Sequence, residues 1–176
     1  MISILGTTKD VKGGKKATRW THWRPTVSVV MHEAFPVDRM ELIYHPQHLA
    51  KALIVAEYIR IASPDTEVAL IEAVWENPWD FAEIYHWFYE FARHYPVNTD
   101  EESYYLNITT GTHVSQICMF LMSEAHLLPA QILQVSPVTQ SGDKAKGSLH
   151  SIDLDLARYE SWQSATLKNP VLVRIF

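Results

Sequence analysis

The sequence predicts an α/β domain of the Rossmann-like class, with a mostly parallel central sheet and helices on both of its faces. Apolar, β-favouring runs alternate with segments of helical periodicity through most of the chain. The stretch 104–116, YYLNITTGTHVSQ, is typical of a buried strand that ends in a short polar turn and opens directly into a helix. Strands that alternate with helices in this way favour right-handed crossovers and parallel pairing.

The first half of the chain supplies three strands and two helices. Residues 1–6 form a short apolar run that stops at a glycine, and residues 40–44 and 68–74 are further apolar runs, so all three are expected to be strands. Residues 47–62 carry apolar side chains at helical spacing, which predicts an amphipathic helix. Residues 25–31 begin with a proline, which fits the first turn of a helix, although the β-branched residues after it have lower helix propensity.

The second half continues the alternation. Residues 79–95 form an aromatic-rich segment with Asn-Pro at its entrance and a proline just past its end, which predicts a helix. A strand is expected at residues 104–108 and a helix at residues 114–128, because a proline follows that segment directly. Residues 131–135 read as a fifth strand. Residues 151–156 alternate with period two, which suits a strand with one solvated face.

Composition limits the class of protein. At 176 residues the chain fits one domain, and its net charge of −5 argues against a general nucleic-acid coat. The single cysteine, Cys118, excludes an internal disulfide and is expected to be a small core residue. No targeting segment opens the chain and no apolar run reaches the length of about 18 residues that a membrane span needs. We therefore expect a cytoplasmic protein with no membrane partner.

The turn at residues 109–113 is the strongest candidate for a binding site. Gly111 allows a sharp turn or a close approach to a ligand. The helix that follows starts with free N–H groups and a positive dipole end, which suits a phosphate or another anion. Thr109, Thr110 and Thr112 add hydroxyls, and His113 adds a titratable ring. The alternative is a purely structural cap, in which Thr112 is the N-cap residue and Gly111 serves the turn geometry.

The polar loop at residues 7–19 is expected to face this turn, because ligands of parallel sheets bind beyond the carboxyl ends of the strands. Its cations, which favour either an electrostatic gate for a phosphate-rich ligand or a solvated surface loop, are Lys9, Lys12, Lys15, Lys16 and Arg19. The loop is not a P-loop, and the chain has no Gly-x-Gly-x-x-Gly fingerprint, so nucleoside triphosphates and NAD are poor candidates. No cofactor is expected.

Other groups give weaker signals. Trp20, Trp23 and Arg24 can stack on unpaired bases, or else serve core packing or a dimer interface. Glu83 and His86 have the spacing of half a metal site, but the matching second half is missing, so no metal is expected. The serines lack the context of a nucleophile elbow, which leaves conventional hydrolase chemistry without support.

Five blocks of the sequence, in order, resemble the amino-terminal sensor domains of RtcR-type regulators, which belong to the CARF superfamily of CRISPR-associated Rossmann-like domains. The blocks are residues 20–26 (WTHWRPT), 38–42 (DRMEL), 77–81 (NPWDF), 108–118 (ITTGTHVSQIC) and 152–159 (IDLDLARY). The resemblance covers about residues 1–160, which we expect to form one CARF-like domain, with residues 161–176 as an unassigned tail. RtcR-type regulators continue into an ATPase and a DNA-binding domain, whereas this chain carries no Walker motif and no helix-turn-helix.

The resemblance implies a homodimer that holds an oligonucleotide in a cleft on its two-fold axis: a cyclic oligoadenylate, or a short RNA end in RtcR-type sensors. Self-contained relatives often cleave cyclic oligoadenylate without a metal, by attack of a ribose 2′-OH that leaves a 2′,3′-cyclic phosphate. The first hypothesis is therefore a ring nuclease that switches off type III CRISPR signalling in antiviral defence, with His113 and Lys9 as catalytic residues. The alternative is a non-catalytic sensor or sponge. The expected ligand-binding residues are Gly6, Thr7, Thr8, Thr109, Thr110, Gly111, Thr112, His113, Gln116 and Arg24.

Overall fold

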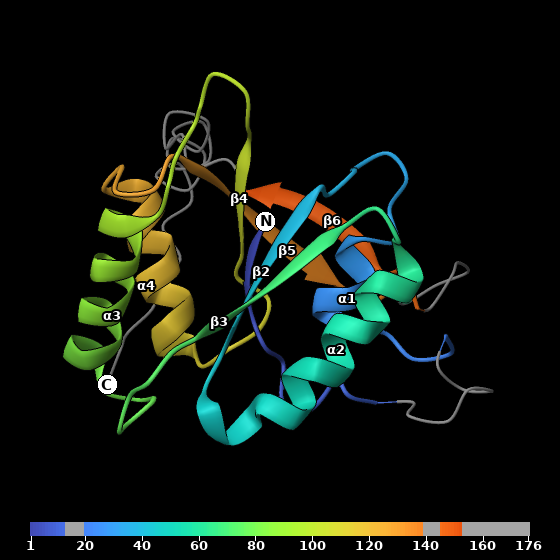
Figure 1. Ribbon diagram of the computed structural model, residues 1–176, viewed down its shortest axis with the longest axis horizontal. Helices are drawn as coiled ribbons and strands as arrows, with labels where there is room; N and C mark the ends of the chain where they lie inside the picture. The colour runs from blue at the N-terminus through green and yellow to red at the C-terminus, as the bar shows by residue number, and fades with distance from the viewer. Residues whose placement is uncertain (13–19, 139–144, 153–176) are drawn as a thin grey trace, which may run out of the picture.

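In a computed structural model, residues 1–12, 20–138 and 145–152 can be described, and residues 13–19, 139–144 and 153–176 lie outside the description. Within the described part, one six-stranded sheet lies between two pairs of helices (Figure 1). The strands are β1 (Ile2–Ile4), β2 (Arg39–Tyr44), β3 (Glu67–Glu72), β4 (Tyr104–Asn107), β5 (Ala130–Ser136) and β6 (Ser148–Ile152). The helices are α1 (Pro25–Val29), α2 (Leu49–Ala62), α3 (Phe81–His94) and α4 (His113–Glu124), with a 3-10 turn, η2 (Pro46–His48), before α2.

The strand order is β3-β2-β1-β4-β5-β6, with β1 to β5 parallel and β6 antiparallel to β5. The predicted mostly parallel, Rossmann-like sheet is therefore confirmed. The expected strand at residues 151–156 is wrong at its start, because β6 already begins at Ser148. Gly147, in a left-handed conformation with φ +65°, ends the preceding turn, so pairing with β5 begins one residue later. Residues 153–156 lie outside the described residues, as does the expected boundary at residue 160.

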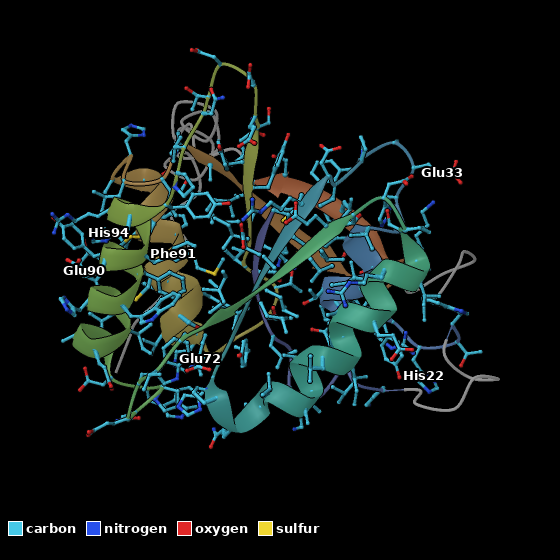
Figure 2. All side chains as sticks on the ribbon, in the orientation of Figure 1. His22, Glu33, Glu72, Glu90, Phe91 and His94 are labelled. Carbon is cyan, nitrogen blue, oxygen red and sulfur yellow. The ribbon has the colours of Figure 1, made fainter. Side chains whose placement is uncertain are left out.

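Alternating side chains of the strands fill two cores, one on each face of the sheet. Ile2 and Ile4 of β1 join the core under α3 and α4, whereas Leu42 of β2 joins the core under α1 and α2. The two helix pairs cover opposite faces in Figure 1, which confirms the predicted helices on both faces. Figure 2 shows the two faces of the amphipathic helix α3: Phe91 points toward the sheet, whereas Glu90 and His94 point outward.

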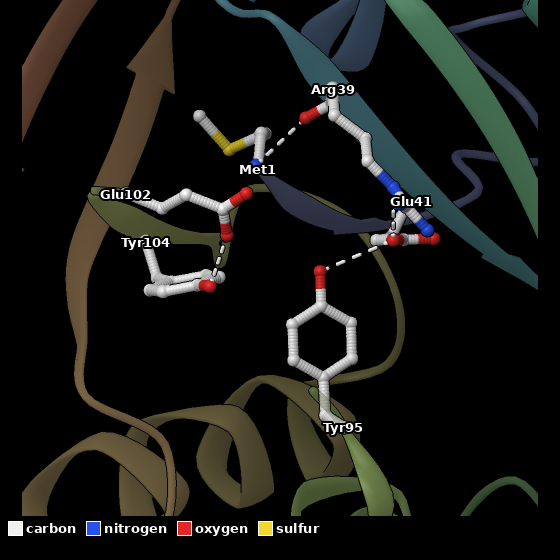
Figure 3. Close-up of polar contacts among 6 residues, drawn as sticks. All are labelled: Met1, Arg39, Glu41, Tyr95, Glu102 and Tyr104. Carbon is white, nitrogen blue, oxygen red and sulfur yellow. Dashed lines mark hydrogen bonds and ion pairs between the residues drawn. The ribbon is translucent and has the colours of Figure 1, made fainter. Parts of the chain in front are cut away.

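Polar contacts hold the amino ends of the central strands together (Figure 3). The Met1 amino group donates to the Arg39 carbonyl at 2.9 Å, and Arg39 Nε lies 2.8 Å from Glu41 Oε1. The Tyr95 hydroxyl, just past α3, donates to the same oxygen at 3.1 Å, and burial raises the pKa of Tyr95. This cluster anchors β1, β2 and the end of α3 at the edge of the sheet opposite the carboxyl ends of the strands.

Two expectations drawn from composition can be compared with the described residues. Cys118 lies fully buried in the core under α3 and α4, as predicted. Within the described ranges, the helices are too short or too polar to cross a bilayer.

Candidate ligand-binding site

A cleft of about 580 Å³ opens at the carboxyl edge of the sheet. Because β1 and β4 are neighbouring parallel strands, the loop after β1 and the turn after β4 leave the sheet side by side. Both segments line the cleft, with Gly6, Thr7, Thr8 and Lys9 from the loop and residues 109–112 from the turn. The structure therefore brings most of the expected ligand-binding residues together, and their contact with a ligand stays a prediction.

The turn delivers the amino end of α4 to the cleft. Gly111 has φ +94°, a conformation that a residue with a Cβ rarely adopts. Thr112 is the N-cap residue, and its Oγ1 accepts from the Ser115 N–H at 3.2 Å. Within the described residues, the N–H groups of His113 and Val114 have no hydrogen-bond partner. This end of α4 can therefore donate to an anion through its backbone.

The threonine hydroxyls of the turn hold its shape. Thr110 Oγ1 donates to the Ile4 carbonyl, and Thr112 Oγ1 donates to the Pro78 carbonyl at 3.0 Å. Thr109 Oγ1 accepts a β5 backbone N–H at 2.7 Å, which leaves its own proton available to a ligand. The side chains therefore fix the turn, as the structural interpretation predicts, and binding of a ligand by the backbone N–H groups at the start of α4 stays a prediction.

A buried aspartate fixes the loop after β1. Asp10 Oδ2 accepts from the Gly6 N–H at 2.9 Å and from the Thr26 hydroxyl at 2.7 Å, and its Oδ1 accepts from the Thr26 N–H at 2.8 Å. Burial raises the pKa of Asp10 to about 6, against the opposing effect of these bonds. A Cβ on residue 6 would lie 2.3 Å from Asp10 Oδ2, so only glycine lets the Asp10 carboxylate approach the backbone at this position.

The same polar network continues to the turn after β4. Ser3 Oγ lies 3.4 Å from Thr26 Oγ1 and accepts from Asn107 Nδ2 at 3.1 Å. Asn107 Oδ1 accepts from the Thr109 N–H at 3.1 Å, so buried polar groups join both walls of the cleft. Sequence reasoning missed Asp10 and this network. The available signal was polar residues, Ser3 and Asn107, inside runs that read as buried strands.

Two lysines place positive charge at the loop after β1. The Lys9 amino group lies 5.0 Å from the centroid of the Trp23 ring, and both residues line the cleft. The Lys51 amino group, from α2, donates to the Thr7 carbonyl at 3.1 Å. Lys51 was not among the residues expected from the sequence. Three of the loop cations lie outside the described residues: Lys15, Lys16 and Arg19.

Three expected site residues do not line the cleft. Arg24 is 2% exposed, and its guanidinium carbon lies 4.4 Å from the centroid of the Tyr58 ring, because the planar cation stacks on an aromatic face in the interior. His113 is exposed beside the cleft, with its ring centroid 5.0 Å from that of Trp79. Gln116 lies half-buried one turn further along α4.

The cleft extends further than the sequence predicts, over the carboxyl ends of β2 and β3. The side chains that line this part are Tyr44, His45, Gln47, His48, Trp75, Glu76 and Trp79. Parallel strands end at the same edge, so the residues just after these two strands carried the available signal.

Glu83 on α3, which has the spacing of half a metal site with His86, is engaged with the backbone instead. Its two carboxylate oxygens accept from the backbone N–H groups of Glu76 and Asn77, at 2.5 and 2.9 Å, so it closes the turn before α3. Among the described residues, no group of three His, Cys, Asp or Glu side chains is arranged to hold a metal ion.

Replacing Thr112 with valine, which has the same shape without the hydroxyl, is expected to destabilise the fold by about 1 to 2 kcal/mol, because α4 loses its cap and its link to Pro78. Urea unfolding monitored by tryptophan fluorescence measures the change. Thr112→Ser keeps the hydroxyl and is the control, expected within about 0.5 kcal/mol of the unchanged protein. Equal losses in both variants would contradict the role of the hydroxyl.

Comparison with known proteins agrees with this architecture. The fold is similar to that of Csm6 from Enterococcus italicus bound to cyclic hexa-2′-fluoro-hexa-dAMP, with a TM-score of 0.64 and 16% identity over 95% of this chain and 44% of that chain. It is also similar to Can2 from Sulfobacillus thermosulfidooxidans in complex with cyclic tetra-adenylate, with a TM-score of 0.50 and 18% identity. That match covers 77% of this chain and 31% of the Can2 chain. The fold and the cleft at its carboxyl edge thus define a Rossmann-like α/β domain.

Sequence similarity makes the assignment more specific. The family described as RtcR, Regulator of RNA terminal phosphate cyclase, matches residues 1–169. The chain is 40% identical over 161 residues to the Transcriptional regulatory protein RtcR of Escherichia coli K12, and the match covers 91% of this chain. The chain therefore belongs to the RtcR family. It spans about 30% of the length of that relative.

Proposed function

We propose that this domain is a sensor that binds a phosphate-rich oligonucleotide, a cyclic oligoadenylate, at the carboxyl edge of its sheet. One observation carries the proposal: the unpartnered N–H groups that begin α4 adjoin a cleft that Lys9 also lines. The buried network from Asp10 to Asn107 holds both walls in place before a ligand arrives, which reduces the entropy lost on binding. Ligands named for Csm6 and Can2 support this choice of chemistry.

The oligomeric state is part of this proposal. A cyclic oligoadenylate repeats its phosphates, and a two-fold pair of chains would present two copies of the α4 amino end to one ring. The homodimer therefore remains a prediction, and one ring bound per two chains is its expected signature.

Titration calorimetry with cyclic rings of three to six adenylates tests binding and stoichiometry together. We expect one ring size to bind tightly at one ring per two chains, and to raise the melting temperature, since a ligand of the folded state stabilises it. A short RNA with a 2′,3′-cyclic phosphate end distinguishes the related alternative, a sensor of RNA ends. If neither kind of ligand binds at micromolar concentration, the oligonucleotide function is wrong.

A second candidate function, metal-independent cleavage of the bound ring, is favoured by one observation. His113 is exposed beside the cleft, and Lys9 lines it. In this reaction a ribose 2′-OH attacks the adjacent phosphorus, the 5′-oxygen leaves, and the products carry a 2′,3′-cyclic phosphate and a 5′-OH. His113 would transfer the proton, and Lys9 with the α4 N–H groups would stabilise the developing charge.

Incubation of labelled cyclic tetraadenylate with the protein and excess EDTA distinguishes cleavage from binding alone. Cleavage predicts a linear product, and replacing His113 with alanine is expected to slow its formation at least about tenfold. Glu124→Ala is the control and should leave the rate unchanged, because Glu124 is exposed at the opposite end of the same helix and does not line the cleft. An intact ring after long incubation with excess protein leaves the sensor function alone.

A further inference from the structure

The cleft consists of two halves with different chemistry. The half at the carboxyl ends of β1 and β4 is lined by Lys9 and by Thr112, the N-cap residue at the start of α4. The half at the carboxyl ends of β2 and β3 is lined by aromatic, imidazole and amide side chains, which are Tyr44, His45, Gln47, His48, Trp75 and Trp79. A volume of about 580 Å³ is also more than a phosphate group alone would fill.

The β2–β3 half is not suited to a phosphate. Among the described residues, no lysine or arginine lines it. His45 Nε2 lies 3.1 Å from the Trp75 carbonyl, and His45 Nδ1 accepts the Gln47 N–H at 3.3 Å, so both ring nitrogens are already engaged within the protein. Burial, followed by the nearby charge of Lys51, lowers the pKa of His48. The Glu76 carboxylate adds negative charge, which repels a phosphate.

Its side chains suit a nucleobase instead. Trp79 is 57% exposed at the cleft and offers an indole face on which an unpaired base can stack. Gln47 is exposed and its amide both donates and accepts, which matches the N6 donor and N7 acceptor of adenine. Guanine presents two acceptors on that edge and calls for an arginine or a lysine, and none lines this half in the described residues.

The two halves of the cleft meet where the segment before α3 contacts the start of α4. Thr112, the N-cap residue of α4, donates to the carbonyl of Pro78, the residue before Trp79. The Trp79 ring also lies 5.0 Å, between centroids, from the His113 ring at the start of α4. The indole is therefore held next to the start of α4, where the phosphate is proposed to bind.

We infer that the β2–β3 half of the cleft holds an adenine base, stacked on Trp79 and recognised at its edge by Gln47, while the phosphate of the same nucleotide lies at the amino end of α4. This inference rests on the proposed oligonucleotide function and adds the position of the base and the residues that recognise it.

The test compares binding of linear tetraadenylate, tetrauridylate and an abasic ribose-phosphate tetramer of equal charge. We expect the unchanged protein to bind tetraadenylate at least about tenfold more tightly than the other two. Replacing Trp79 with alanine should weaken tetraadenylate binding about tenfold and leave abasic binding unchanged, whereas Trp79→Phe should retain most of the affinity. Gln47→Glu, which cannot donate, should reduce the preference for adenine.

Phe81→Ala is the matched control, because Phe81 is another exposed aromatic residue near the start of α3 and does not line the cleft. Melting temperatures verify that each variant is folded. Equal affinity of the unchanged protein for all three tetramers, or unchanged adenylate binding by Trp79→Ala, would overturn the base site and leave the oligonucleotide function intact. If the protein binds none of the tetramers and none of the cyclic rings, both the base site and the oligonucleotide function are wrong.

Discussion

Replacing Asp10 with alanine is expected to lower the free energy of unfolding at pH 7 by about 3 kcal/mol, because the buried donors of Gly6 and Thr26 lose their shared acceptor. The buried Arg24 guanidinium also loses its nearby negative charge. In a chain of this length the loss corresponds to a melting temperature lower by roughly 6 to 12 °C. Differential scanning calorimetry measures it.

The exposed residue Asp65 provides the control, since Asp65→Ala is expected to change stability by no more than about 0.5 kcal/mol. Asp10→Asn separates charge from shape, because the amide keeps one acceptor but turns an NH₂ group toward donors. We expect the free energy of unfolding of Asp10→Asn to lie between those of the unchanged protein and Asp10→Ala. An Asp10→Ala protein as stable as Asp65→Ala would show that the network does not support the fold.

The pH dependence of the Asp10 contribution has a definite sign. The pKa of Asp10 is about 6 in the folded protein, against an ordinary value of 3.8, so the folded state binds more protons between these values. The free energy of unfolding therefore falls as the pH rises through this window, by about 3 kcal/mol in total, and levels off above it. Urea unfolding from pH 4 to 7 should show the advantage of the unchanged protein over Asp10→Asn shrinking as the pH rises. A constant difference would contradict the raised pKa.

Replacing Gly111 with alanine is expected to reduce the affinity for an oligonucleotide at least about tenfold, and to destabilise the fold by about 2 kcal/mol. Its φ of +94° strains any residue with a Cβ, and that Cβ would lie 2.6 Å from Ser115 Oγ. Ser115 Oγ donates to the Thr112 carbonyl at 2.8 Å, so relieving the contact moves the first turn of α4. The N–H groups proposed to hold the phosphate then shift out of line.

A double variant separates the two causes. Gly111→Ala with Ser115→Ala removes the 2.6 Å contact but keeps the backbone strain, so we expect it to recover part of the lost affinity relative to Gly111→Ala alone. Ser115→Ala by itself is the control and should bind nearly as the unchanged protein does. Calorimetric titration with the preferred ring gives all four affinities. Unchanged affinity in Gly111→Ala would show that the turn does not hold the ligand.

Features that depend on neighbouring residues were predictable. The alternation of strands and helices, the buried Cys118 and the capping role of Thr112 follow from periodicity and from contacts within one turn of chain. The meeting of the loop after β1 with the turn after β4 was also predictable, since parallel strands end at one edge. The start of β6 was missed because residues 148–152 depend on their pairing with β5.

Features that depend on contacts between residues far apart in the chain could not be predicted from the sequence. Asn107 reaches Ser3 across 104 positions of the chain, and Thr26 reaches Asp10 across 16, so no local pattern indicates that these groups meet. The same reason explains why Arg24, expected at the ligand, lies buried on Tyr58, and why Trp79 lies at the cleft beside His113. The sequence by itself determined the class of fold and the turn that begins α4, the proposed anion site, because both arise from local backbone geometry. Only the tertiary structure decided which side chains support that end and which face the cleft, because burial and hydrogen bonding are settled between elements far apart in the chain.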